Sequence, residues 1–311
     1  MIFTQEQTDQ LLQIVEYNSS FLIGFNLGVE ALTAYDKFVL QQQGIDLSIL
    51  DQEWPPYLQS FMWGRLSQQL SEKQASMVEY DDFEKYLKRG QYIPLSKREK
   101  REYEIARSKS YGHIKSFTDK IKNDVNGVIA NEEQESSLDY AKLLKEELST
   151  GVRDRKSLQN IVSELGTKTG NWGLDWGQIV DTEANNIFQR GRSEMILREK
   201  GENAEVYKDV FPGACKWCIK LYLTEGIGSQ PIVFKLPELI SNGSNVGRKQ
   251  ADWLATIDST HPFCRCTLRE KLPHQIWNEE SKTFTAPEKH ERKIERKSKA
   301  KITVGDKKFE V

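Results

Sequence analysis

All four cysteines of the chain lie in two short clusters, and a histidine accompanies the second. The first cluster is the Cys-x-x-Cys turn Cys215 to Cys218, and the second is the string His-Pro-Phe-Cys-Arg-Cys from His261 to Cys266. Thiolate and imidazole are the usual ligands of zinc, which prefers four donors in a tetrahedron. The sequence therefore predicts one structural zinc per chain. The candidate ligands are Cys215, Cys218, Cys264, Cys266 and His261.

Five candidate donors for four positions leave two ligand sets open. One set is the four cysteines, and the other is three cysteines with His261. If His261 is not a ligand, it can orient a thiolate by a hydrogen bond. Two disulfides would need an oxidising compartment, but the first six residues show neither the basic nor the apolar region of a secretion signal. A catalytic zinc needs an open coordination position, so the pattern favours a structural site.

Other catalytic chemistry finds little support in the sequence. The chain has four histidines and no His-Glu-x-x-His motif. Glu183 is the one carboxylate to test as a catalyst, although a helix-capping or salt-bridge role against the zinc lobe is the stronger expectation. His113 is expected to be a surface residue on a charged helix. We therefore expect a protein that is not an enzyme.

The order of these motifs resembles a known family. Thr182-Glu183, then the Cys215/Cys218 pair, then the string from His261 to Cys266 are similar to the phage Mu F-type head-morphogenesis domain over roughly residues 135 to 270. The resemblance implies a minor capsid protein of a tailed phage, present in the virion and made in the host cytoplasm. It implies the portal protein and the major capsid protein as partners, and a role in head assembly. In some members it extends to double-stranded DNA and to genome packaging or delivery.

The elements that must position the cysteines are mainly helical. Apolar periodicity predicts helices over 8–43, 57–80, 82–92 and 96–128, with Ser96 and Glu99 forming a capping box at the start of the last one. Further helices are expected around 138–148 and 158–165. The clearest helix runs from a cap at Asp175 to about Gly201. The predicted fold class is mainly α with a small α+β zinc-knot lobe, in which long helices precede short strands and loops.

After Gly201 the pattern changes to short strands. We expect strands over 206–211 and 267–269, with a short apolar run at 232–234 between them. The last ten residues predict a hairpin that turns at Gly305-Asp306 and docks on some other surface. The predicted divisions are a helical region 1–130, the head-morphogenesis domain 131–278, a basic linker 279–301 and a C-terminal β-hairpin 302–311.

Charge and hydropathy limit the possible partners. The net charge is −2, so any argument for nucleic acid must be local. The basic stretch 289–301, which holds Lys293, Arg296, Lys297 and Lys299, suits DNA or an acidic surface. A zinc-dependent nucleic-acid-binding protein is therefore the alternative function. No apolar run approaches the roughly 20 residues that span a bilayer, so no membrane is expected.

Overall fold

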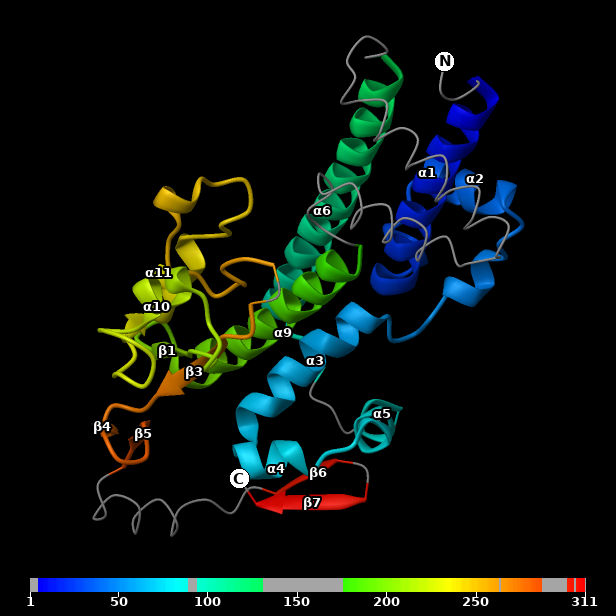
Figure 1. The fold of residues 1–311 in the computed structure, drawn as a ribbon. Helices are drawn as coiled ribbons and strands as arrows, with labels where there is room; N and C mark the ends of the chain where they lie inside the picture. The colour runs from blue at the N-terminus through cyan, green and yellow to red at the C-terminus, as the bar shows by residue number, and fades with distance from the viewer. Residues whose placement is uncertain are drawn as a thin grey trace. The chain divides into compact units, whose positions relative to one another are not determined.

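The structure is a computed structural model that describes residues 5–88, 94–130, 176–262, 264–286, 301–304 and 306–310. Over these residues the chain is mainly helical, with a few short antiparallel strands (Figure 1). It divides into two compact units, one of residues 1–58 and 105–183, the other of 59–104 and 184–311. The expected N-terminal region 1–130 thus contributes to both units. The helices expected around 138–148 and 158–165, and the cap at Asp175, lie outside the described residues.

The first unit is built on α1 (Gln5–Leu27), α2 (Ala34–Gln42) and most of α6 (Lys97–Ala130). The prediction of one helix over 8–43 was wrong because the chain breaks at Gly28, whose φ of 93° suits glycine. The 3₁₀ turns η1 (Val29–Ala31) and η2 (Leu47–Leu50) flank α2. Thr33 then starts α2 with a capping box, and Gly44, with a φ of 76°, follows its end.

A buried carboxylate ties the helices of the first unit together. Asp36 is fully buried and forms a 2.6 Å ion pair with Lys115 of α6. It also accepts hydrogen bonds from Ser20 of α1 and Tyr111 of α6. Burial acts to raise the pKa of Asp36, but the hydrogen bonds from Lys115 and Thr33 outweigh it and hold the pKa below its ordinary value.

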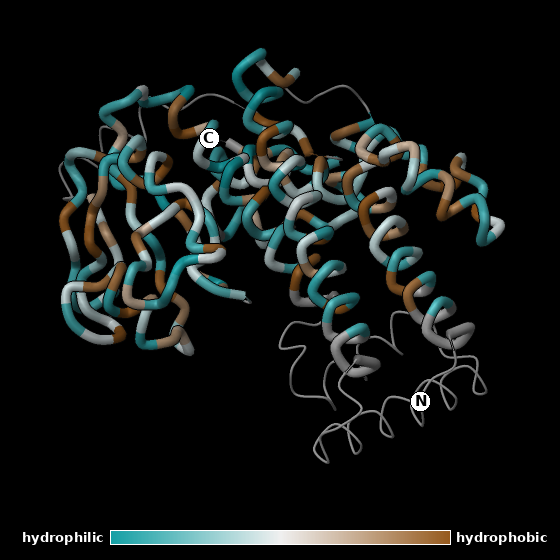
Figure 2. Tube along the Cα trace, turned by 90° about the horizontal axis from the view of Figure 1, so that it is seen from above, coloured by the Kyte–Doolittle hydropathy of each residue, from teal (hydrophilic) through white to brown (hydrophobic). Residues whose placement is uncertain are grey.

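The helices of the second unit include α3 (Pro56–Gln69), α4 (Glu72–Ser76), α5 (Tyr80–Lys88), the start of α6 and most of α9 (Trp176–Lys200). The single helix predicted over 57–80 was wrong because Ser71 forms a capping box with Gln74 and starts a new helix. The capping box of Ser96 and Glu99 at the start of α6 is confirmed. Figure 2 shows hydrophilic and hydrophobic residues alternating along the helices, as expected for amphipathic helices that bury one face.

Two glycines allow α3 and α9 to pack with their backbones in contact. A Cβ on Gly64 would lie 2.1 Å from the carbonyl oxygen of Phe188, and one on Gly191 would lie 2.1 Å from that of Phe61. Both distances are far below van der Waals contact, so only glycine fits at either position. The crossing fixes α9 against α3.

A small sheet completes the second unit. Its strands β1 (Glu205–Asp209), β2 (Phe234–Lys235) and β3 (Thr267–Lys271) pair antiparallel in the order β2-β1-β3, which confirms the expected strands. Figure 1 shows α10 (Lys216–Tyr222) and α11 (Leu236–Ser241) beside this sheet, and the 3₁₀ turn η3 (Gln250–Asp252) follows α11 along the chain. The apolar core that they enclose includes Val206, Tyr222, Leu268 and three of the cysteines.

Two hairpins follow the sheet. Residues 283–285 were expected in the linker but form β5 (Thr283–Thr285), which pairs with β4 (Ile276–Asn278). The C-terminal hairpin of β6 (Lys301–Val304) and β7 (Lys307–Glu310) is confirmed. It docks on the same unit, because Lys307 lies 2.7 Å from Asp82 of α5 and donates to the Met77 carbonyl. Among the described helices, none is long and apolar enough to cross a membrane.

Candidate metal centre

The five sequence-predicted donors converge on one small site in the second unit. They form two groups of three, in each of which the ligand atoms lie within 4.8 Å of one another. One group is Cys215, Cys218 and His261, and the other is Cys218, Cys264 and Cys266. Cys218 therefore belongs to both groups. The two clusters, far apart along the chain, are brought together as the sequence predicted.

Local structure explains how each cluster presents its donors. Cys215 caps the start of α10 and Cys218 lies in its first turn, so residues three apart share one face of the helix. Cys264 and Cys266 lead into β3, where residues two apart point to the same side. Cys218, Cys264 and Cys266 are buried, whereas Cys215 and His261 are partly exposed.

The spacing of the donor atoms fits a tetrahedral metal. The Sγ atoms of Cys218 and Cys264 are 3.7 Å apart, and the Cys218 Sγ is 3.4 Å from the His261 Nε2. A zinc with bonds of about 2.3 Å to sulfur and about 2.0 Å to nitrogen would place such pairs roughly 3.8 and 3.5 Å apart. The soft donor set and these edges fit a metal ion. The geometry leaves the identity of that ion open.

The side chains of α9 hold the second cluster. Asn185 donates to the Cys264 carbonyl at 3.1 Å, and Gln189 donates to the Cys266 carbonyl at 3.4 Å. Gln189 also accepts from the amide of Leu268 at 2.8 Å, and Asn186 accepts from the amide of Ser259 at 2.7 Å. Asn185, Asn186 and Gln189 are amides on neighbouring turns of α9, which is the one signal that the sequence offered for them. We did not predict their role.

Two buried cations flank the loop before His261. Arg190 of α9 lies 2.6 Å from Asp258, and both side chains are buried. Lys208 of β1 is 1% exposed and donates to the carbonyls of Ile257 at 2.6 Å and of Asp258 at 3.4 Å. Burial lowers the pKa of Lys208, while Cys264 and the other nearby acidic groups act against that shift. A lysine in a core strand was not predicted.

Hydrogen bonds between the buried thiols shift the pKa of each of them. Hydrogen bonds from Cys218 and Cys266 lower the pKa of Cys264 well below its ordinary value. The hydrogen bond with Cys264 raises the pKa of Cys218.

Glu183 occupies a different position from the five donors. Its carboxylate accepts a hydrogen bond from Ser110 at 2.7 Å and pairs with the Nδ1 atom of His113 at 2.8 Å. Glu183 therefore pairs with side chains of α6, whereas a salt bridge against the zinc lobe was expected. The expectation for His113 was wrong, since this side chain is partly buried in the ion pair rather than on the surface.

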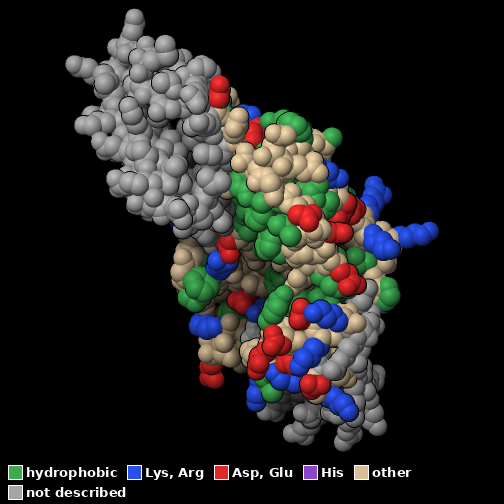
Figure 3. Space-filling view, turned by 90° about the vertical axis from the view of Figure 1, so that its right-hand side faces the viewer, with side chains coloured by type: hydrophobic (Ala, Val, Ile, Leu, Met, Phe, Trp, Pro, Cys, Tyr) green, Lys and Arg blue, Asp and Glu red, His purple; other side chains and the backbone are tan. Residues whose placement is uncertain are grey.

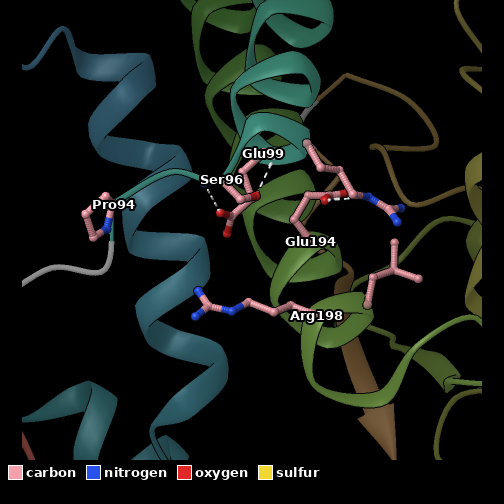
Figure 4. Close-up of a pocket in the computed structure, with 7 residues that line it drawn as sticks. Pro94, Ser96, Glu99, Glu194 and Arg198 are labelled. Carbon is pink, nitrogen blue, oxygen red and sulfur yellow. Dashed lines mark hydrogen bonds and ion pairs between the residues drawn. The ribbon is translucent and has the colours of Figure 1, made fainter.

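The second unit also contains a cavity of about 310 Å³ at the start of α6. Figure 4 shows the Glu99 carboxylate turned toward Ser96 and the Glu194 carboxylate of α9 turned away from it. Glu194 is 4% exposed and pairs with Arg98 at 3.0 Å. Burial raises the pKa of Glu194 to about 7, which Arg98 only partly counteracts. None of the residues that line this cavity is a candidate metal ligand, and no sequence pattern predicted it.

The chain was compared with protein-family models, with curated proteins and with solved structures. None of the three comparisons finds a match.

Proposed function

We propose that this chain is a minor head protein of a tailed phage that is associated with the portal vertex. One structural zinc ion would cross-link its two cysteine clusters. The observation that supports the proposal is the convergence of the two cysteine clusters in the order typical of Mu F-type head-morphogenesis domains. The proposed partners are the portal protein and the major capsid protein, and the proposed location is the virion. We propose no enzymatic activity for the chain.

The proposed role of the metal is to close the loop between Cys218 and Cys264. The Cys218–Cys264 contact joins residues 46 positions apart, and the segment between them carries only short elements. Such a segment has a small core of its own, and a metal cross-link limits the conformations of its unfolded state. A protein that must keep one shape within a particle benefits from this restraint.

The experiment that tests the function is mass spectrometry of purified virions and procapsids. We expect peptides of this chain in both, at a small fraction of the abundance of the major capsid protein. Phage that encodes Cys264→Ser should yield fewer filled heads than phage that encodes Ser281→Ala, an exposed control position. Absence of the chain from intact particles would refute the proposal.

The identity of the metal has its own measurement. We expect one equivalent of zinc in the purified chain by plasma mass spectrometry, and none in Cys264→Ser. Zinc retained in full by that variant would show that the cluster is not the binding site.

Nucleic-acid binding is the second candidate, and an aromatic and basic surface beside the cysteines favours it. The Nζ atoms of Lys216 and Lys220 each lie 5.5 Å from the ring centre of Trp217, which contacts Trp253 edge to face at 5.9 Å. Such a surface suits phosphates and stacked bases. On the face in Figure 3, by contrast, acidic and basic side chains are interspersed.

A salt titration would distinguish this candidate. We expect the combined change Lys216→Ala and Lys220→Ala to weaken binding of a labelled DNA duplex and to flatten its salt dependence by about one unit of slope per lost phosphate contact. Neutralising Lys293, Arg296, Lys297 and Lys299, which lie outside the described residues, tests the basic stretch in the same assay. Lys235→Ala is the control. Equal affinity in all variants would refute nucleic-acid binding by these surfaces.

A further inference from the structure

We propose that the metal has three thiolate ligands and one imidazole ligand, that a buried lysine balances their charge, and that the fourth cysteine stays outside the coordination sphere. The four ligands are Cys218, Cys264, Cys266 and the Nε2 atom of His261. The buried lysine is Lys208, and the outside thiol, open to modification, is Cys215. This inference rests on the metal centre of the proposed function and adds its ligand set.

The first support comes from the hydrogen bond of the imidazole. The Nδ1 atom of His261 donates to the carbonyl oxygen of Pro262 at 2.7 Å, so the proton of the neutral ring lies on Nδ1. The Nε2 atom then carries a lone pair, and it faces the Sγ atom of Cys218 at 3.4 Å. A ring nitrogen fixed by a backbone carbonyl is the usual arrangement of a histidine that binds a metal through its other nitrogen.

The second support comes from the burial of the sulfurs. Cys218, Cys264 and Cys266 are 0%, 3% and 1% exposed, and their ligand atoms form one group within 4.8 Å. Cys215 is partly exposed, and its sulfur belongs only to the group with Cys218 and His261. The three buried sulfurs therefore define one side of the metal position, and Cys215 and His261 compete for the fourth.

The contact with Cys218 favours His261 as the fourth ligand, because 3.4 Å from the Nε2 atom to the Sγ atom is the spacing of two ligands on one ion. A divalent ion with three thiolates and a neutral imidazole carries a net charge of −1, which the ammonium group of Lys208 cancels. The Nζ atom of Lys208 donates to the carbonyls of Ile257 and Asp258, which lie in the loop just before His261.

The carboxylate of Asp258 does not change this balance. It lies 2.6 Å from the guanidinium of Arg190, and both side chains are at most 7% exposed. This pair is neutral as a whole. Arg190 is thus engaged by carboxylates, those of Asp258 and, at 3.8 Å, of Glu102, and Lys208 is a second buried cation beside the site.

The ligand set can be measured without any variant. X-ray absorption at the zinc edge of the purified, zinc-loaded chain should show three sulfur neighbours at about 2.3 Å and one nitrogen at about 2.0 Å. Four sulfur neighbours would overturn the inference while leaving the metal centre intact. A chain without bound metal would instead refute the metal centre of the proposed function.

Alkylation identifies the outside thiol. The zinc-loaded chain treated with N-ethylmaleimide under native conditions should gain one label, on Cys215, and four labels after denaturation with a chelator. The Cys215→Ser variant should keep its zinc and gain no label, whereas His261→Ala should lose zinc and gain further labels. Protection of Cys215, with zinc lost from Cys215→Ser, would overturn the assignment.

The role of Lys208 needs a measurement that packing alone would not change. We compare zinc release to a chromogenic chelator from Lys208→Met, which keeps the length of the side chain, and from Lys208→Arg, which keeps its charge. Release from the methionine variant should be at least tenfold faster than from the parent, with the arginine variant between them. Circular dichroism of the loaded variants verifies that each has folded. An unchanged release rate in a folded Lys208→Met protein would overturn this role.

Discussion

Removal of the metal should destabilise the second unit by an amount that the loop length sets. The proposed metal would join Cys218 to Cys264, whose positions differ by 46 residues. Closing a loop of that length in the unfolded chain restricts its entropy by an amount worth about 4 kcal/mol at room temperature. For a unit of this size each kcal/mol moves the melting temperature by roughly 2–4 °C, so we expect a decrease of roughly 8–16 °C.

Thermal unfolding followed by circular dichroism measures this decrease. One sample is refolded with zinc and the other with a chelator, so that slow release of a tightly held ion does not hide the effect. The Cys264→Ser variant is the control, because it should melt at the temperature of the metal-free parent and respond to neither treatment. Equal melting temperatures for the two parent samples would refute the idea that a metal closes this loop.

Three further changes test the packing and the buried charges. Gly191→Ala should lower the unfolding free energy by about 3 kcal/mol in urea titrations, since its Cβ would meet a carbonyl of α3 at 2.1 Å. Gly112→Ala, with no atom within 4 Å, should instead raise it by up to about 1 kcal/mol. The folded pKa of Glu194 is about 7 against an ordinary 4.5, so the folded state holds a proton that the unfolded state loses. The stability that Glu194 contributes is therefore present below about pH 4.5 and lost as the pH rises to 7. The difference in unfolding free energy between Glu194→Gln and the parent should change by about 3 kcal/mol in favour of the variant over that range. Unfolding free energies that change in parallel with pH would contradict the raised pKa. Asp36→Asn should destabilise the first unit by about 3 kcal/mol because Lys115 loses the nearer of its two carboxylate partners, whereas the exposed Asp46→Asn should have little effect.

The cluster of candidate ligands was predictable because the spacing within each half of it is local in the sequence. Cys215 and Cys218 are set three apart by one helical turn, and Cys264 and Cys266 are set two apart by the approach to a strand. Spacing of this kind survives in the folded chain whatever surrounds it. The capping box of Ser96 and Glu99 was predictable for the same reason, since both partners lie within one turn.

The breaks in the long helices were harder to predict. The apolar period continues across Gly28 and across Ser71, so periodicity alone extends each helix too far. What ends the helices is the competition between the helical hydrogen bond and a side-chain cap, together with a glycine that adopts a positive φ. Thr33 with Asp36 and Ser71 with Gln74 both have the capping pattern, and such a pattern starts a new helix even where the apolar periodicity continues.

Lys208 and the amides of α9 could not be predicted because their partners are distant in the sequence. The alternation of β1 places Lys208 on the buried face, where a lysine is ordinarily excluded. Only the folded structure shows the two carbonyls that accept its hydrogen bonds and the sulfurs near it. A buried charge without a local partner in the sequence is thus itself a signal that an opposite charge will be found in the fold.

The hydrogen bonds from α9 and the proposed metal both restrain the segment that carries Cys264 and Cys266. Asn185 and Gln189 hold the backbone carbonyls of Cys264 and Cys266, so the positions of these two residues do not depend on a bound ion. A site whose donors are already in place loses less conformational entropy when it binds. The metal therefore has to order mainly the α10 side of the site, where Cys218 joins the two groups of donors. It follows that loss of the α9 amides should weaken metal binding even though neither residue is a ligand.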